Sequence, residues 1–512
     1  MINIKTDRDS DQPIYAQIRD AVIKAIKEGS LNPGDRLPAV TAFAKMVGVT
    51  HSTIRRALKD LIASGHVVSH VGRGTFVDDP FAPERETKDG KTPLKSHPSP
   101  QVSHEFTLAA RRLRMGITKS LEDLMDLARR PGLISFTAGI PDPGIMEPGT
   151  LDRLVKDALK AGQETYQVYG GPALGMTALR EILTSRFKQD GINISPDQIL
   201  ITSGSQQAVS IVAQAALENK QRIICETPCY MGIPNAFGAL GHWVESAPRD
   251  WEGPIPDRLN HFNDKKPSVF YLCPELHNPM GTDISPERQT MLIKWSREQD
   301  VEIIADEIFH DLRFEGPAPV SIFSEAGTGN VVVIGSLSKS FMLGLRIGWL
   351  ITSPEKIRSF VSLKRAMDLG CPPLMQGIAL SLLRSGEYDI HLEKAHEHYR
   401  LRRDTAIETL EREMPDGVTW TLPKGGFHMW LELPNGYSSI ALFLHAIERG
   451  VAFFPGPMQD VDHRFINAFR LSYGSVTPEE IEKGVKLLAD AVKALIKEPP
   501  RDPGLSGLGD FL

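Results

Sequence analysis

The first eighty residues carry apolar side chains at the spacing of short helices. One helical pattern runs over residues 12–27, and shorter ones follow over 39–47 and 51–64, where Thr50 can cap the third helix. Two apolar runs then flank residues 71–74, which favours a hairpin. Helix, turn, helix and hairpin together predict a winged helix-turn-helix, whose second paired helix can enter the major groove of DNA.

From about residue 110, helical segments alternate with short apolar runs, which is typical of an α/β fold. The predicted strands are residues 198–202, 222–225, 268–272, 302–305, 331–334 and 348–352. Between the two regions, residues 79–105 are polar, contain prolines and lack periodicity, so they predict a linker. Open α/β sheets bind ligands at the carboxyl ends of their strands, so the residues after these runs are candidates for a site.

Five of the predicted strands are followed by polar motifs. In chain order these motifs present Ser205 with Gln206, then Tyr230, Asn278, Asp306 and Lys339. The amides that open the helix at Ser205 could bind a phosphate. A carboxylate at Asp306 could pair with a protonated ring nitrogen, and the amide of Asn278 could bond a ring hydroxyl.

Lys339 stands in the motif GSLSKSFMLGLRIGW, directly after a buried apolar strand. A lysine in a tight, partly buried turn loses its charge easily and can form a Schiff base. Ser336, Ser338 and Arg346 surround it in sequence and could bind a phosphate. A Schiff-base lysine beside a phosphate cradle is what pyridoxal 5′-phosphate (PLP) requires, so we expect PLP as the cofactor.

Composition limits the alternatives. The 512 residues are too long for one ordinary domain, and the net charge of −6 argues against a protein that coats nucleic acid along its whole length. The four cysteines have no spacing typical of a metal site, so we expect reduced thiols and no bound metal. The start lacks an apolar signal core and no run is long enough to span a membrane, so we expect a cytoplasmic protein.

The first region resembles the DNA-binding domain of the GntR family of bacterial regulators. The motifs PIYAQI, GxLxPGDRLP, GVTHSTIRRAL and GRGTFV carry the resemblance over residues 11–77. It implies DNA contacts from Arg36, Thr53, Arg55, Arg56 and Arg73. The family usually has serine, arginine and arginine where this chain has Ala39, Thr41 and His51. Residues 1–80 hold 11 basic and 9 acidic residues, a net charge of only +2, so a module kept for packing or dimerisation stays possible.

Residues 110–495 resemble the class I/II aminotransferases of PLP fold-type I, on the ordered motifs described above together with YQVYGG, SFTAGIPDP and FRLSYG. The resemblance implies that Lys339 forms the internal aldimine, Asp306 pairs with the pyridine nitrogen, Asn278 contacts O3′ and Tyr230 stacks on the ring. It also implies a role for each of the remaining residues: Ser205, Gln206, Ser336, Ser338 and Arg346 hold the phosphate, Tyr169 reaches the phosphate of a neighbouring subunit, Gly139 borders the substrate and Arg470 binds its carboxylate. Phe309 replaces the tyrosine that usually donates to O3′.

The combination looks like the MocR subfamily of regulators. The domains expected from it are a winged helix at 1–78, a linker at 79–110, an aminotransferase-like PLP domain at 111–498 and a flexible tail at 499–512. Within the PLP domain, a large subdomain with a mostly parallel sheet is expected at about 165–370 and a smaller α+β subdomain at 111–164 and 371–498. The resemblance implies a homodimer, typically head-to-tail, that binds promoter DNA and senses PLP or an amino compound through the internal aldimine.

Two other functions stay open. The chain could be a working aminotransferase with a vestigial winged helix, which the changes at Ala39, Thr41 and His51 favour and Phe309 disfavours. It could also be a racemase or lyase of the same fold.

Overall fold

The computed structural model describes residues 6, 13–27, 30–31, 35–63, 66–70, 74–77, 128, 131–161, 172–215, 222–265, 267–327 and 329–497. The chain divides into two compact units, Met1–Val102 and Ser103–Leu512. The predicted linker at 79–110, the predicted tail at 499–512, Arg73 and Tyr169 lie outside the described residues. Among the described helices, none has both the length and the apolar surface needed to cross a bilayer.

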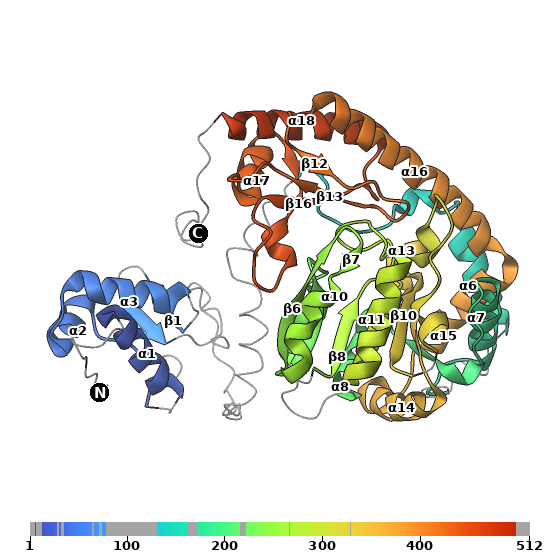
Figure 1. The fold of residues 1–512 in the computed structure, drawn as a ribbon, viewed down its shortest axis with the longest axis horizontal. Helices are drawn as coiled ribbons and strands as arrows, with labels where there is room; N and C mark the ends of the chain where they lie inside the picture. The colour runs from blue at the N-terminus through green and yellow to red at the C-terminus, as the bar shows by residue number, and fades with distance from the viewer. Residues whose placement is uncertain are drawn as a thin grey trace, which may run out of the picture. The chain divides into compact units, whose positions relative to one another are not determined.

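The first unit is a winged helix-turn-helix, as predicted (Figure 1). Its elements are α1 (Ile14–Lys27), α2 (Val40–Val47), α3 (His51–Ala63), β1 (Val67–His70) and β2 (Gly74–Val77). Gly48 ends α2 in the left-handed conformation with φ of 76°, and its N–H donates to the Ala44 carbonyl at 2.9 Å. Thr50 accepts from the N–H of Thr53 at 3.4 Å, so it caps α3 as expected. The two strands pair antiparallel.

The second unit is built on an eight-stranded sheet with the order β4-β11-β10-β9-β8-β5-β6-β7. Its strands are β4 (Ile199–Thr202), β5 (Arg222–Thr227), β6 (Trp243–Asp250), β7 (Gly253–Pro254), β8 (Val269–Leu272), β9 (Glu302–Asp306), β10 (Val331–Ser336) and β11 (Gly348–Ile351). The five central strands run parallel, and β4, β11 and β7 are antiparallel to their neighbours. The prediction of a mostly parallel sheet is confirmed, although β6, a partly polar strand, was not predicted.

Both faces of this sheet are buried. In β10, Val331 and Val333 belong to one apolar core while Val332 and Ile334 belong to another, as the alternation of side chains along a strand requires. The helices of this part are α6 (Thr150–Ala161), α7 (Thr177–Gln189), α8 (Ser205–Ala215), α9 (Gly232–Ala239), α10 (Pro256–Leu259), α11 (Pro286–Gln299), α12 (Ile322–Ala326), α13 (Leu337–Ser340), α14 (Pro354–Asp368) and α15 (Pro373–Ser385).

A second, antiparallel sheet has the order β12-β13-β16-β15 and packs with the last helices of the chain (Figure 1). Its strands are β12 (Thr419–Trp420), β13 (His428–Glu432), β15 (Phe454–Pro455) and β16 (Ala468–Ser472), with α16 (Glu387–Glu413), α17 (Ser439–Glu448) and α18 (Pro478–Ile496) beside them. The short strands β3 (Ile134–Ser135) and β14 (Val451–Ala452) pair with each other. This sheet brings His428 and Arg470 to the carboxyl end of the larger sheet, where Lys339 lies.

Candidate functional site

Lys339 lies in a one-turn helix, α13, that begins where β10 ends. Ser336 caps this turn, because its hydroxyl accepts from the Ser338 N–H at 3.1 Å and donates to the Ile347 carbonyl at 2.9 Å. The Lys339 amine is partly buried and donates to the Gly139 carbonyl at 2.5 Å. Burial and the positive charge of Arg470 lower the pKa of Lys339 to about 8, against the attraction of Asp306. A lysine with this pKa has a much larger neutral, nucleophilic fraction near neutral pH than an ordinary one.

Asp306 ends β9, the strand next to β10, and its carboxylate is buried. The Tyr271 hydroxyl donates to one carboxylate oxygen at 2.7 Å, and the Ile308 N–H donates to the other at 3.2 Å. Burial raises the pKa of Asp306 to about 6, while these bonds and the charge of Lys339 oppose the rise. Asp306 is therefore held in one orientation and can ionise beside a cationic partner. Sequence reasoning missed Tyr271, because it stands inside an apolar strand and no motif marks it.

Arg470 lies on β16 and is buried, yet its hydrogen bonds to the described residues go only to neutral oxygens. It donates to the Asn278 side-chain oxygen at 3.0 Å, to the Thr137 carbonyl at 2.7 Å and to the Gln459 side-chain oxygen at 3.4 Å. Its Nε is buried and has no hydrogen-bond partner within the described residues. Burial lowers the pKa of Arg470 to about 10. A buried guanidinium in such surroundings is stabilised by an anionic ligand.

A second group of residues forms a cradle at the start of α8. Arg346 has the left-handed backbone conformation, with φ of 51°, and its guanidinium donates to the Ser203 carbonyl at 3.3 Å. A Cβ added to Gly204 would lie 2.6 Å from Arg346 Nη2, so the guanidinium would have to move away from its present position. Ser205 opens α8, whose first N–H groups have no partner inside the helix. A helix N-terminus beside a guanidinium favours phosphate.

The structure connects seven of the predicted residues through hydrogen bonds or through the effect of one charge on the pKa of another group: Lys339, Gly139, Asp306, Asn278, Arg470, Arg346 and Tyr230. Ser336 and Ser338 form the lysine turn, and Ser205 and Arg346 adjoin Gly204. Gln206 is exposed, and its amide donates to the Gly232 carbonyl at 3.2 Å rather than toward Arg346. Tyr230 is 46% exposed, and its charge acts to raise the pKa of Arg470, against the effect of burial.

A buried carboxylate, Glu226, holds the segment that presents Asn278. It accepts from the Cys273 N–H, its Oε1 lies 3.2 Å from His277 Nε2, and its Oε2 lies 3.6 Å from Arg249 Nε. Arg249 also donates to the Thr282 hydroxyl at 3.2 Å, on the far side of the same segment. Glu226 and Arg249 therefore contact residues on both sides of Asn278 in the sequence and hold this segment in place. Only the strand-end position of Glu226 could have indicated this role from the sequence.

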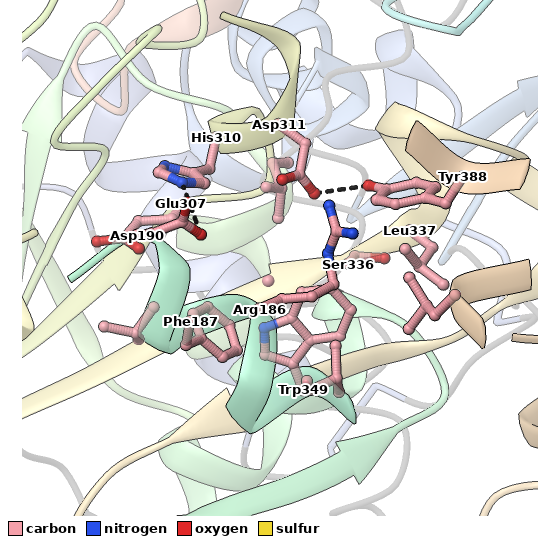
Figure 2. A pocket seen from close by; sticks show the side chains of 15 residues that line it. Arg186, Phe187, Asp190, Glu307, His310, Asp311, Ser336, Leu337, Trp349 and Tyr388 are labelled. Atoms are coloured by element: carbon pink, nitrogen blue, oxygen red, sulfur yellow. Dashed lines mark hydrogen bonds and ion pairs between the residues drawn. The ribbon is translucent and has the colours of Figure 1, made fainter. Parts of the chain in front are cut away.

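A cavity lined by both charged and apolar side chains lies beside the lysine turn, between α7, the segment after β9 and the start of α16 (Figure 2). Tyr388 joins it to the turn, since its hydroxyl lies 2.7 Å from the Ser340 hydroxyl and donates to Asp311 at 2.6 Å. Glu307 is buried at its wall, and burial together with the charge of Glu275 raises the pKa of Glu307 to about 8. The Glu307 carboxyl therefore keeps its proton at neutral pH in the folded protein.

Replacement of Glu307 by glutamine is expected to flatten the dependence of stability on pH. In the unfolded chain this carboxyl titrates near 4.5, so between that pH and about 8 only the folded state keeps the proton. The wild-type free energy of unfolding should therefore fall as pH rises through this range, by about 1–3 kcal/mol more than in Glu307→Gln. Urea unfolding at pH 5, 6, 7 and 8 measures the difference, and parallel curves for the two proteins would contradict the assignment.

In the first unit, the predicted DNA-contacting residues differ in how available they are. Arg55 is exposed on α3, whereas Arg56 stacks on the Tyr15 ring at 4.1 Å and donates to its hydroxyl at 3.4 Å. Thr53 is partly buried and bonds Thr50 at 2.8 Å. Arg36 is exposed, with its guanidinium 5.9 Å from the Phe76 ring centroid. Of the two arginines on α3, Arg56 contacts Tyr15, so Arg55 is the more available for DNA.

Comparison with known proteins agrees with this division. The aminotransferase class I and II family matches residues 131–488, and the bacterial regulatory proteins of the gntR family match residues 14–77. The chain is 32% identical to a 2-aminoadipate transaminase of Thermus thermophilus, over 77% of this chain and 98% of that protein. It is 27% identical to an uncharacterized HTH-type transcriptional regulator of Bacillus subtilis, YdfD, over 94% of this chain and 97% of that protein.

One similar solved structure is LysN, the α-aminoadipate aminotransferase of Thermus thermophilus, complexed with N-(5′-phosphopyridoxyl)-L-leucine. It is 30% identical, with a TM-score of 0.69, and the match covers 77% of this chain and 100% of LysN.

PLP is the cofactor that these matches indicate, and the residues present fit it. The Arg346 guanidinium lies against Gly204 at the N-terminus of α8, which suits a phosphate. Lys339 supplies the amine, and the buried carboxylate of Asp306 suits a protonated ring nitrogen. The orphaned Nε of Arg470 suits a ligand carboxylate beside the cofactor.

The aminotransferase match covers more than half of the chain, and the winged helix precedes it in the same polypeptide. The protein therefore belongs to the aminotransferase class I and II family, as a member fused to a GntR-type winged helix in the arrangement of the MocR subfamily of regulators.

Proposed function

We propose that this protein is a transcriptional regulator that binds DNA through its winged helix and senses PLP or an amino compound at the Lys339 site. The observation that carries the proposal is a buried Arg470 without an anionic partner among the described residues, close to a lysine of lowered pKa, in a chain that begins with a recognition helix. Such a site attracts an amino acid.

When bound, PLP supplies an aldehyde that reacts with primary amines and a ring that withdraws electrons. Asp306 holds negative charge for the ring nitrogen, with Tyr271 fixing its orientation. Asn278 offers its amide to the ring hydroxyl while its oxygen engages Arg470. Lys339 presents an amine that is partly neutral near pH 7, and Arg470 offers its free Nε to a carboxylate. These residues bind and orient, which is what a sensor and an enzyme of this family share.

The two ligand-binding cations also hold backbone of the second unit, so ligand binding could change the conformation of that unit. Lys339 and Arg470 donate to the carbonyls of Gly139 and Thr137, so both ligand-binding cations hold the segment before Asp142. Asp142 in turn pairs with Arg402 on α16. Ligands that engage the two cations compete with these bonds and favour a second conformation, and a difference in ligand affinity between two states is what regulation requires.

Substitution of Gly204 should weaken the binding of PLP without removing the reactive lysine. A Cβ at this position would clash with Arg346 Nη2, and φ of 87° is strained for any other residue. Gly204→Ala should raise the dissociation constant of PLP by about tenfold or more, the loss expected for one charge-assisted hydrogen bond to phosphate. Fluorescence titration with PLP measures this, and Gly191→Ala, with a φ of 79° and nothing within 4 Å of the added Cβ, is the matched control. Equal affinities for the two variants would exclude Gly204 from the cradle.

Binding to DNA is expected to depend on Arg55 and on salt. The first eighty residues carry a net charge of only +2, so we propose that a homodimer supplies the phosphate contacts that one winged helix lacks. Arg55→Ala should weaken binding to the DNA upstream of the protein's own gene and reduce the slope of log K against log salt. Arg56→Ala should also lower the melting temperature, because it removes the stack on Tyr15. DNA binding that is unchanged in Arg55→Ala would contradict a contact between Arg55 and DNA.

The second candidate function is an active aminotransferase acting on an amino acid. The identity of 32% with a transaminase and the complete set of Lys339, Asp306, Asn278 and Arg470 favour it. Phe309 disfavours it, because the buried ring packs against Phe427 and His428 and offers no hydroxyl to the site. A transamination assay with an amino-acid panel, run on the preparation used for DNA binding, distinguishes the two.

A further inference from the structure

His428 is a buried histidine that none of the contacts described so far explains. It lies on β13, is 2% exposed, and its Nδ1 is 2.9 Å from the Ser472 hydroxyl. Its Nε2 is buried and has no hydrogen-bond partner within the described part of the chain. An unpartnered buried nitrogen is costly, so a ligand that satisfies it gains affinity.

The free edge of this imidazole faces the functional site. A Cβ added to Gly139, whose carbonyl accepts from Lys339, would lie 2.6 Å from His428 Cε1 and 3.0 Å from Nε2. The ring also makes an edge contact with Phe309, with centroids 5.2 Å apart. The Nε2 edge of the imidazole therefore lies beside Gly139, whose carbonyl accepts from Lys339.

Arg470 is a neighbour of His428 on the same sheet face. In the ladder between β13 and β16, His428 stands opposite Ser472, and Arg470 is two residues from Ser472. Residues two apart in a strand share a face, so the imidazole and the guanidinium are diagonal neighbours. Each has one buried N–H position without a partner, Nε2 of His428 and Nε of Arg470, among the residues that the structure describes. A carboxylate has two oxygens, so one could accept a hydrogen bond from His428 Nε2 and the other from Arg470 Nε.

We propose that His428 determines ligand specificity by donating a hydrogen bond from Nε2 to the carboxylate that Arg470 binds, so that the site selects amino acids over the corresponding amines. This inference rests on the proposed function. With Ser472 donating its hydroxyl proton to Nδ1, the neutral imidazole carries its own proton on Nε2 and is a donor there. Burial lowers the pKa of His428, and the nearby positive charges of Arg470 and Lys339 lower it further. The ring is therefore neutral in the absence of ligand.

Three substitutions separate this role from a structural one. His428→Gln places an amide N–H where Nε2 lies, whereas His428→Asn can replace only Nδ1 and its bond to Ser472. His428→Phe keeps the ring shape and removes both nitrogens. We expect His428→Asn and His428→Phe to raise the dissociation constants of amino acids roughly tenfold to hundredfold, the loss of one charge-assisted hydrogen bond, and His428→Gln to restore most of the affinity.

The test titrates PLP-loaded full-length protein with L-alanine, L-leucine and L-tyrosine, and with ethylamine, 3-methylbutylamine and tyramine, and follows the visible absorbance spectrum. The expected result is that His428→Asn and His428→Phe weaken the binding of the three amino acids and leave the affinities for the three amines and for PLP unchanged. If the dissociation constants of the amino acids and of the amines change equally in these variants, or if His428→Gln and His428→Asn behave alike, His428 does not contact the carboxylate. Wild-type protein that binds PLP but responds to none of the amino acids would overturn the proposed sensing of amino acids as well, which separates the two failures.

Discussion

Lys339→Ala is expected to abolish the covalent attachment of PLP. In the wild type, borohydride should fix PLP to one lysine, and mass spectrometry of the digested protein should locate it at Lys339. The reason is specific to this position, because burial and Arg470 lower the pKa of Lys339 from an ordinary value of 10.5 to about 8. The fixed fraction should fall from near completion to background.

Two controls make this result interpretable. Lys364 is also buried, but it is paired with Asp368 at 2.7 Å, so Lys364→Ala should leave the label at Lys339. Lys339→Ala should still bind PLP reversibly through the cradle of Gly204 and Arg346, which shows that it is folded. A Lys339→Ala protein that borohydride still labels to the wild-type extent would show that another lysine is the reactive one.

The second large effect is expected for Arg470→Gln, which should remove the response to amino acids. One charge-assisted hydrogen bond to a carboxylate is worth about 1.5–3 kcal/mol, so affinity should fall roughly tenfold to a hundredfold. Glutamine is shorter and neutral, yet it can still bond Thr137 or Asn278, which limits the damage to the fold. The measurement is the amino-acid titration of the PLP-loaded protein.

The control for this variant is PLP itself. Arg470 lowers the pKa of Lys339, so the variant should keep its PLP but require a somewhat higher pH for the lysine to lose its proton. Retained PLP with a lost amino-acid response would assign the carboxylate site to Arg470. A variant that binds amino acids as the wild type does would show that the buried guanidinium serves only the packing of β13 and β16.

Sequence reasoning reached the parts of this molecule that are marked by local pattern. The capped helix after Thr50, the apolar run of β10 and the residues at five strand ends each depend on a few neighbours in the chain, so pattern and spacing indicate them. The same holds for Lys339 and Asp306, because each directly follows or ends a buried strand.

The parts that sequence reasoning missed depend on contacts across the chain. Tyr271 reads as one more apolar strand residue until β8 and β9 are paired and its hydroxyl meets Asp306. His428 stands in a short buried strand, and only the ladder with β16 places it beside Arg470. The small sheet consists of strands of two to five residues, too short for a period-two pattern to be recognised.

The most direct test of the regulator proposal is a gel shift with DNA upstream of the protein's own gene, with and without PLP, for wild type and Lys339→Ala. The account predicts that the wild type binds, that PLP changes its affinity, that an amino acid changes it further, and that Lys339→Ala binds DNA without responding to either. Failure of the wild type to bind this DNA even at low salt, together with transamination of an amino acid at ordinary enzyme rates, would contradict the account and make the protein an aminotransferase.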